Sequence, residues 1–324
     1  MDKNIVPDIS IVMPVYNGLP YLPQAIESIL SQTFINFEFI IINDASKDRS
    51  LEVIRSYSDP RIKIIDNPKN LHLISSLNIG LRAAQGKYVA RMDQDDISFP
   101  ERLNKQYDFL QSHPDVILVG TWSNIMNSVE KFIKVHKNPL RSNVLKYELM
   151  FGNTITHPSI MFRKEAIQNI GGYGVEWINT EDYNLYSRLI RSHKLANIGE
   201  PLINYRVHKT SLTNEKSSQV VMHENTKKII RENISHYITL SDSDHQLITQ
   251  VLIARHADSK LPLSLMMRAQ HLHREIYLSF LQKESAHLDT RDKKEIRVRY
   301  IARRNLLFKK YLVGKYHLLT HKNA

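Results

Sequence analysis

The chain has 324 residues, of which 42% are hydrophobic and 24% are charged, as in a globular protein of one large or two ordinary domains. It has no cysteine, which excludes disulfides, thiolate metal ligands and a cysteine nucleophile. Residues 1–8 do not resemble a signal peptide, and no apolar run reaches the ~20 residues of a membrane-spanning helix. We therefore expect a cytoplasmic protein, with peripheral attachment to a membrane left open.

The formal net charge is +11, and most of it lies in the C-terminal third. Residues 215–324 hold 20 Lys and Arg against 11 Asp and Glu, whereas residues 1–214 hold 24 against 22. Residues 291–324 alone contain 11 basic and two acidic residues. A basic segment of this kind suits an anionic membrane surface or a nucleic acid.

Strands and helices are predicted to alternate in the first 91 residues. Apolar runs predict strands over 9–15, 37–42, 62–65 and 88–91. Helical spacing of apolar residues predicts helices over 21–32, 50–58 and 71–85, and Gly86 is expected to cap the last of these. This alternation predicts an α/β fold with a mostly parallel sheet flanked by helices.

The pattern continues to about residue 207 and then becomes helical. Helices are expected over 100–112 and 183–192, and strands over 116–119, 159–162 and 201–207, whereas residues 121–150 show no clear pattern. Further helices are expected over 220–237, 244–257, 262–281 and 293–311, where glycines nearly vanish. We therefore expect a catalytic domain over 1–214 and a helical, basic C-terminal region over 215–324.

Polar residues follow three of the predicted strands, at Tyr16-Asn17, Asn43-Asp44 and Asp93-Gln94-Asp95-Asp96. Ligands bind at the carboxyl ends of the strands in parallel α/β sheets, so these clusters should converge. Three carboxylates in four residues repel one another unless a hard cation lies between them, which suggests Mg²⁺ or Mn²⁺ on a diphosphate. The alternative for this acidic stretch is a turn that precedes the helix beginning near Ser98.

These motifs resemble the family 2 glycosyltransferases, nucleotide-sugar-dependent enzymes with the GT-A fold. The resemblance covers about residues 7–210. It rests on eight motifs in order: Met13-Pro14-Val15-Tyr16-Asn17, Ser28-Ile29-Leu30-Ser31-Gln32-Thr33-Phe34, Asn43-Asp44-Ala45-Ser46, Ala90-Arg91-Met92-Asp93-Gln94-Asp95-Asp96-Ile97, His157-Pro158-Ser159, Gly171-Gly172-Tyr173, Glu181-Asp182-Tyr183 and Tyr205-Arg206-Val207-His208. The sequences of several motifs are similar to those of bacterial β-1,3-galactosyl- and N-acetylhexosaminyltransferases that build lipooligosaccharide and O-antigen chains.

The resemblance implies an inverting, metal-dependent hexosyltransferase. The expected donor is a UDP-sugar carrying Gal, GlcNAc or GalNAc, and the expected acceptor is a hydroxyl of a saccharide or lipid-linked saccharide. A β-1,3 linkage in a surface polysaccharide, such as O-antigen, capsule or lipooligosaccharide, is the expected product. The expected cofactor is Mn²⁺ or Mg²⁺.

The resemblance also implies which residues hold the donor. Asp44 is expected to accept a hydrogen bond from the uracil N–H, because a buried donor favours a charged acceptor. The other expected donor-binding residues are Pro14, Val15, Tyr16, Asn17, Asp93 and Gln94. Two plainer alternatives stay open: the first three residues of this set end a strand, and Asn43-Asp44 forms a turn.

Asp95 is the expected metal ligand, and His208 is a second candidate, with an ordinary surface histidine as the alternative. Asp182 is the expected general base, because an inverting transferase needs a carboxylate that takes the proton of the acceptor hydroxyl. Glu181 should point elsewhere on the helix. Asp96 has a weaker predicted role, as a supporting residue or a helix cap. His157 and Arg163 are predicted to border the acceptor site.

Two other functions were weighed against this one. A nucleotide-sugar pyrophosphorylase needs a Gly-rich, basic loop after the first strand, and residues 15–20 do not provide it. A basic nucleic-acid- or membrane-binding protein with a non-catalytic GT-A domain fits the charge. However, the bases are not interleaved with stacking aromatics, so we expect no nucleic-acid partner. Residues Arg291–Lys310 are instead predicted to contact the inner membrane, or else to form a solvated helix face.

Overall fold

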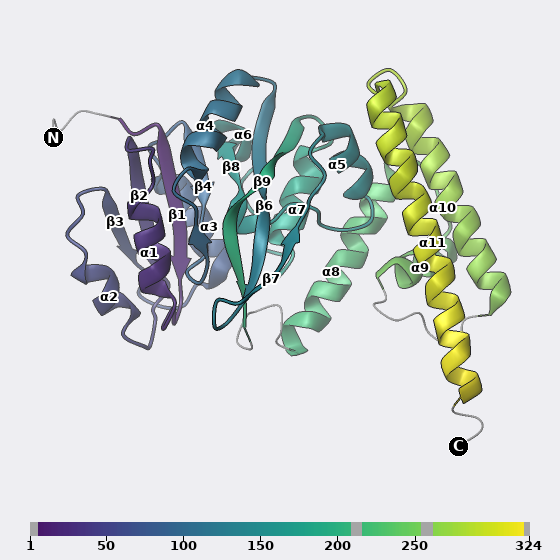
Figure 1. Cartoon of the computed structure of the whole chain (residues 1–324), viewed down its shortest axis with the longest axis horizontal. Coiled ribbons are helices and arrows are strands. Elements are labelled where there is room, and N and C mark those ends of the chain that lie inside the picture. The colour runs from purple at the N-terminus through teal and green to yellow at the C-terminus, as the bar shows by residue number, and fades with distance from the viewer. Residues whose placement is uncertain (1–5, 209–215, 254–261, 321–324) are drawn as a thin grey trace. The chain divides into compact units, whose positions relative to one another are not determined.

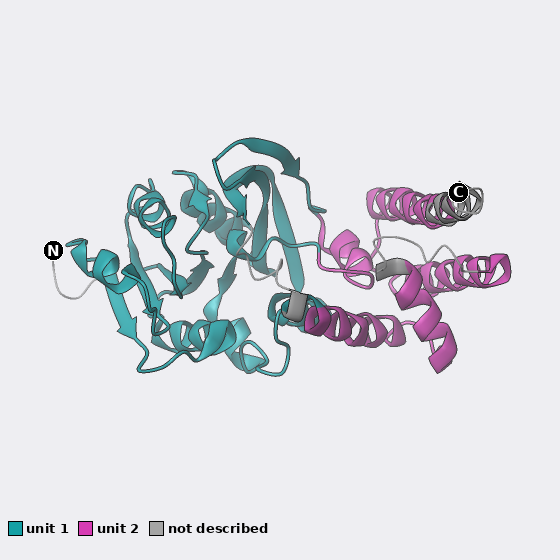
Figure 2. Ribbon diagram, turned by 90° about the horizontal axis from the view of Figure 1, so that it is seen from below, with its two compact units in different colours: residues 1–140, 154–219 teal, residues 141–153, 220–324 magenta. Residues whose placement is uncertain are grey.

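The structure, a computed structural model, describes residues 6–208, 216–253 and 262–320 (Figure 1). The chain forms two compact units: unit 1 comprises residues 1–140 and 154–219, and unit 2 comprises residues 141–153 and 220–324 (Figure 2). The domain division expected near residue 214 lies outside the described residues. The assignment of catalysis to 1–214 and of acceptor or membrane contact to 215–324 stays a prediction.

Unit 1 is built on a mixed nine-stranded sheet in the order β3-β2-β1-β4-β8-β6-β9-β5, with β7 paired to β6. The strands are β1 (Ile9–Val15), β2 (Phe37–Asn43), β3 (Ile62–Asp66), β4 (Tyr88–Arg91), β5 (Ile97–Ser98), β6 (Val116–Asn127), β7 (Phe132–His136), β8 (Met161–Arg163) and β9 (Lys194–Val207). Strands β1 to β4 are parallel, as are β6 and β9, whereas β8 runs antiparallel to both β4 and β6. The expected α/β fold is confirmed.

Helices flank this sheet and make up most of unit 2 (Figure 1). Those of unit 1 are α1 (Leu22–Leu30), α2 (Ser50–Ser56), α3 (His72–Ala83), α4 (Arg102–Ser112), a 3₁₀ turn (His157–Ser159), α6 (Lys164–Asn169) and α7 (Glu181–Leu189). Unit 2 contains α5 (Ser142–Glu148), most of α8 (Lys216–Ser235), α9 (Asp242–Ile253), α10 (Leu263–Lys283) and α11 (Thr290–Thr320). Among the described residues, no helix is both long enough and apolar enough to cross a membrane.

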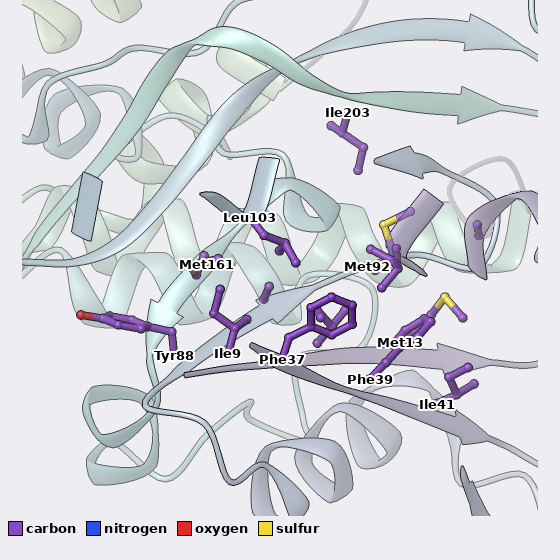
Figure 3. Close-up of a cluster of buried hydrophobic side chains, with 14 of the residues drawn as sticks. Ile9, Met13, Phe37, Phe39, Ile41, Tyr88, Met92, Leu103, Met161 and Ile203 are labelled. Atoms are coloured by element: carbon purple, nitrogen blue, oxygen red, sulfur yellow. The ribbon is translucent and has the colours of Figure 1, made fainter. Parts of the chain in front are cut away.

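The central strands are buried on both faces, which explains why their sequences are near-continuous apolar runs. Every residue of β1 and β2 is buried. In Figure 3, side chains of these two strands, including Met13 and Phe39, form one cluster with Tyr88, Leu103 and Ile203 from later segments. This packing fixes the carboxyl ends of β1, β2 and β4 and therefore the loops that leave them.

Two expectations about the elements are wrong. Strand β6 continues to Asn127 instead of ending at residue 119, because β9 begins at Lys194 and pairs along almost its whole length. Gly86 does not cap α3 in a left-handed conformation, since its φ is not positive. The α3 cap is Ala84, and Gly86 packs against main-chain atoms of Ser10 instead.

Candidate active site

The acidic loop, residues 92–96, joins the end of β4 to β5. One carboxylate oxygen from each of Asp93, Asp95 and Asp96 lies within 4.8 Å of the others. Burial raises the pKa of Asp93 to about 6, with Asp95 adding to the effect against the opposing charge of Arg91. Burial and the two neighbouring carboxylates also raise the pKa of Asp96 well above its usual value. This crowded set of oxygen donors fits a hard divalent cation such as Mg²⁺ or Mn²⁺.

The end of β9 brings a histidine to this loop. The Nε2 atom of His208 lies 2.7 Å from Oδ2 of Asp95, although the two residues are 113 positions apart in the chain. The main-chain N–H of Arg206 donates to Oδ1 of Asp96 at 2.8 Å. The structure therefore brings together the two residues that were predicted to bind metal.

Arg206 supports this arrangement through several contacts, and no role for it is predicted from the sequence. Its side chain is buried, and Nε–H donates to the main-chain carbonyl of Asp95 at 2.8 Å. Its Nη2 donates to Oε1 of Gln24 on α1 at 2.9 Å, and the guanidinium lies 4.3 Å from the Tyr21 ring centre. The Tyr21 ring in turn packs 5.1 Å from the ring of His208. One arginine thus connects α1, the acidic loop and the end of β9.

Gln94 fixes the acidic loop to the end of β1. The N–H of Tyr16 donates to Oε1 of Gln94 at 2.8 Å, and Nε2 of Gln94 donates to the carbonyl of Tyr16 at 3.1 Å. Asn17, in a left-handed conformation with φ 51°, accepts a hydrogen bond from the N–H of Lys47 at 2.8 Å. Both contacts confirm that the polar clusters after β1, β2 and β4 converge.

Asp44 lies buried at the end of β2, beside the last residues of β1, Pro14 and Val15. Its N–H donates to the carbonyl of Val15 at 2.7 Å. Its Oδ1 accepts hydrogen bonds from Nδ2 of Asn67 at 2.8 Å and from the N–H of Leu71 at 2.9 Å. The carboxylate is therefore held in a fixed orientation at the same edge of the sheet as Tyr16.

Asp182 lies in the first turn of α7, where it is partly exposed. Its charge contributes to the raised pKa of Asp93, so the start of α7 lies within electrostatic reach of the acidic loop. Burial and the adjacent Asp182 raise the pKa of Glu181 to about 8. Glu181 is buried and Asp182 is partly exposed, so Asp182 is the more accessible of the two carboxylates.

A buried polar group lies behind this helix start. The Nε2 atom of His157 is 3.0 Å from the Tyr173 hydroxyl, and Nδ1 is 4.0 Å from Oε1 of Glu181. Burial and the nearby charge of Arg91 lower the pKa of His157 well below its usual value, so its imidazole is neutral. Arg91 itself is buried and forms an ion pair with Asp93.

The prediction that Arg163 borders the acceptor site is wrong. Its guanidinium donates to the carbonyls of Val116 and Leu110 and to the hydroxyl of Tyr88. Tyr88 is the first residue of β4, whereas the acidic loop follows the last. Arg163 therefore supports the opposite end of the strand.

A curled mixed sheet flanked by helices, with a buried carboxylate, an acidic loop and a histidine at one edge, is a fold of the GT-A type. Staphylococcus aureus TarS 1–349, in complex with UDP-GlcNAc, shares this fold, with a TM-score of 0.59 over 94% of this chain and 92% of that chain. The mannosyltransferase PcManGT of Pyrobaculum calidifontis, in complex with GDP-Man and Mn²⁺, has a TM-score of 0.50 over 95% of this chain and 85% of PcManGT. The sequence identities are 16% and 14%, so these likenesses concern the fold.

Sequence comparison identifies the family. Residues 10–171 match the model for glycosyl transferase family 2. An uncharacterized glycosyltransferase of Haemophilus influenzae is 35% identical over 259 residues, which cover 76% of this chain and 79% of the relative. The O-antigen biosynthesis glycosyltransferase WbnJ of Escherichia coli is 35% identical over 217 residues, covering 65% and 84%. The chain belongs to the family 2 glycosyltransferases, which confirms the resemblance.

Proposed function

We propose that this glycosyltransferase is metal-dependent and inverting, and that it transfers a hexose or N-acetylhexosamine from a UDP-sugar to a saccharide hydroxyl. The observation that carries the proposal is the 2.7 Å contact between Asp95 and His208, at the sheet edge where Tyr16 is bonded to Gln94. Oxygen and imidazole ligands at this edge suit a cation that accompanies a nucleoside diphosphate.

The donor site extends from the end of β1 to the end of β2. Asp44 would accept a hydrogen bond from the uracil N–H, and its orientation is already set by Asn67 and Leu71. Pro14, Val15 and Tyr16 would line the uridine pocket, with Asn17 and Asp93 beside the sugar and the diphosphate. The UDP-GlcNAc complex of TarS supports a UDP-sugar, whereas the GDP-Man complex of PcManGT shows that another nucleotide must be included in any test.

Asp95 and His208 would hold Mn²⁺ or Mg²⁺, with Asp93 nearby. When bound, the cation would neutralise the charge of the departing nucleoside diphosphate as a Lewis acid. Asp96 accepts a hydrogen bond from the main chain of Arg206, which suits a supporting role in the acidic loop. Asp182 would take the proton of the acceptor hydroxyl as that oxygen attacks the anomeric carbon from the face opposite the diphosphate.

The acceptor would be a saccharide of a bacterial surface polysaccharide. Two relatives support this by name: WbnJ, and the amylovoran biosynthesis glycosyltransferase AmsE of Erwinia amylovora, which is 31% identical over 202 residues. Gal, GlcNAc and GalNAc are the candidate sugars, and a β-1,3 linkage is the expected product. O-antigen, capsule and lipooligosaccharide are the candidate polymers.

We place the enzyme in the cytoplasm, on the inner face of the membrane. Exposed cations and exposed apolar residues share the outer surface of α11, including Lys294, Val298 and Phe308, which suits an anionic lipid surface. Deleting α11 would be a poor test, because Arg141 is paired with Asp292 and Glu148 with Arg303 inside unit 2. Substitution of exposed lysines on α11 keeps these contacts.

The test is a donor screen. The protein is incubated with Mn²⁺ or Mg²⁺ and each UDP-sugar or GDP-sugar, and slow release of the nucleoside diphosphate is followed without acceptor. We expect metal-dependent release from one UDP-sugar, lost in Asp95→Asn and kept in Asp115→Asn, whose carboxylate is exposed and paired with Lys194. Release from a GDP-sugar alone would overturn the donor assignment. Salt-dependent DNA retention without any sugar-nucleotide binding would favour a non-catalytic role.

A further inference from the structure

Strands β6 and β7 form a hairpin whose tip, residues 128–134, is exposed at every position. Three of these residues are large and apolar: Val129 is 77% exposed, Phe132 57% and Ile133 54%. Strand β7 pairs only with β6 among the described strands, so its other edge is unpaired, and four of its five residues are exposed. The hairpin can be followed in Figure 1. Apolar side chains gathered on a projecting tip indicate a contact with a partner rather than with water.

The charges on the same hairpin are almost all positive. Lys131, Lys134 and Lys137 are exposed and alternate with the apolar residues. Glu130 is the only acidic residue between positions 127 and 137, and its Oε1 accepts a hydrogen bond from Nε2 of Gln24 at 2.7 Å. The hairpin therefore presents apolar groups ringed by cations, with its one carboxylate turned toward α1.

We infer that the β6–β7 hairpin is a membrane-contact surface that binds an anionic bilayer. Apolar side chains at the tip would enter the boundary between headgroups and acyl chains, and the lysines would contact anionic headgroups. Lysine suits this position because its long apolar stem lies along the bilayer surface while its ammonium stays hydrated.

A second copy of the chain is a poor occupant of this surface. An edge strand such as β7 can pair with its own copy, but antiparallel pairing about Lys134 sets this lysine against itself. Like charges directly opposite each other destabilise such a pair. A nucleic acid would use the lysines but would leave Val129 and Ile133 without a stacking role.

The hairpin is also held next to the candidate active site. Glu130 bonds to Gln24 and lies 3.5 Å from Nη2 of Arg206, whose Nε donates to the carbonyl of Asp95. A bilayer on the hairpin would therefore lie near the site that acts on a lipid-linked saccharide. This last consequence rests on the proposed function, whereas lipid binding by the hairpin does not.

The experiment is co-sedimentation of the full chain with vesicles of equimolar phosphatidylglycerol and phosphatidylcholine, against vesicles of phosphatidylcholine alone. Two hairpin variants are compared with the parent: Phe132→Ser with Ile133→Ser, and a triple Lys→Gln change at 131, 134 and 137. At about 1 kcal/mol for each lysine, the triple variant should bind anionic vesicles on the order of 100-fold more weakly. The apolar variant should also lose binding.

Two control pairs separate this surface from others. Val175→Ser with Ile178→Ser removes exposed apolar residues elsewhere in unit 1 and should bind vesicles like the parent. Lys293→Gln with Lys294→Gln tests the separate surface on α11. Undiminished vesicle binding by both hairpin variants would overturn the inference. It would also be overturned if the hairpin variants lost binding to DNA but kept binding to vesicles.

A tryptophan reporter tests insertion directly. Phe132→Trp should shift its emission to shorter wavelength on anionic vesicles and be quenched by brominated acyl chains; an unchanged spectrum while the protein co-sediments would contradict insertion. Donor hydrolysis by the same variants, measured without vesicles, should equal that of the parent. If hydrolysis is absent in every form but the vesicle results hold, the proposed function fails and the membrane surface stands.

Discussion

Three buried arginines lie around the acidic loop, in which Asp96 is buried and Asp93 and Asp95 are partly exposed. Arg91 pairs with Asp93, and Arg206 donates to the carbonyl of Asp95. Arg102 is fully buried and donates to the carbonyls of Arg91 and Pro158. Arginine suits this task because it stays charged and offers several donors in a rigid plane. The geometry of the loop therefore depends on these three arginines as well as on the aspartates themselves.

This arrangement predicts that Arg206→Lys weakens Mn²⁺ binding by about tenfold, because residues that orient metal ligands typically contribute 10- to 100-fold. Lysine keeps the charge but cannot reach both the Asp95 carbonyl and Gln24. Free Mn²⁺ measured by electron paramagnetic resonance gives the affinity without reference to turnover. Arg163→Lys is the matched control, since that guanidinium also donates to main-chain carbonyls but at the other end of β4. Equal Mn²⁺ affinity in Arg206→Lys and the parent would refute the positioning role.

The residues of the candidate site were predictable from the sequence where an unusual cluster of side chains marks them. Carboxylates crowded after an apolar strand mark the acidic loop, and the structure brings Asp95 to His208. Arg206 was not predictable, because a buried arginine and a surface arginine look alike in a sequence that alternates along a strand. Gln94 was expected near the donor, but its two hydrogen bonds to Tyr16 depend on how β1 and β4 lie in the sheet.

The junction between α3 and β4 packs closely against the start of β1, at the end of these strands that lies away from the acidic loop. A Cβ on Gly86 would lie 2.7 Å from the main-chain N of Ser10 and 2.8 Å from the carbonyl C of Ile9. The N–H of Gly86 also donates to Oγ of Ser10 at 2.8 Å. Because main-chain atoms of a central strand cannot move aside, this position requires the smallest residue.

We therefore expect Gly86→Ala to lower the free energy of unfolding by about 1–3 kcal/mol, the usual range for overpacking in a core. Urea unfolding followed by circular dichroism measures the change. Gly152→Ala is a suitable control, since nothing lies within 4 Å of a Cβ added there. If Gly86→Ala lowers the free energy of unfolding no more than Gly152→Ala does, the junction can relax to make room for the added methyl group.

Elements were predictable where burial imposes a strong pattern. Strands β1 and β4 match their predicted bounds because their residues are buried on both faces. Strand β7 and helix α5 were not predicted: β7 is exposed on both sides and has no alternation, and α5 has only seven residues. The length of β6 depends on its partner β9, which lies about 80 residues later and gives no local signal.

On the scale of the whole chain, the site is assembled by sheet order rather than by sequence proximity. Strands β2, β1 and β4 are neighbours in the sheet, which brings together residues 14–17, 43–44 and 93–96. Strand β9 pairs with β5 directly after the acidic loop, which adds residues 206–208. Unit 2 adds its own core, in which His273 of α10 is fully buried near Tyr147 and Tyr300.

His273 gives the fold a predictable acid sensitivity. Burial, with a contribution from Arg303 and Arg304, lowers the pKa of His273 to about 3, against about 6.5 in an unfolded chain. Between about pH 6.5 and 3, His273 is therefore protonated in the unfolded state but neutral in the folded state. The free energy of unfolding falls as the pH drops from about 6.5 toward 3. Between pH 7 and pH 5 this one residue should cost about 2 kcal/mol.

His273→Phe removes the titrating group while keeping a ring in the cluster. Its stability, measured by urea unfolding at pH 7 and pH 5, should depend on pH less steeply than that of the parent, by the same amount. A parallel pH dependence in parent and variant would mean that His273 accepts a proton in the folded state.

The central claim is that this chain binds a uridine nucleotide through a cation held by Asp95, and that Asp182 serves the acceptor. The most direct measurement is calorimetric titration of UDP in the presence of Mn²⁺ into the parent, Asp95→Asn and Asp182→Asn. We predict that Asp95→Asn loses most of the affinity, that chelation of the metal has the same effect on the parent, and that Asp182→Asn binds UDP like the parent. UDP binding that ignores both the metal and Asp95, or that disappears in Asp182→Asn, would contradict this account.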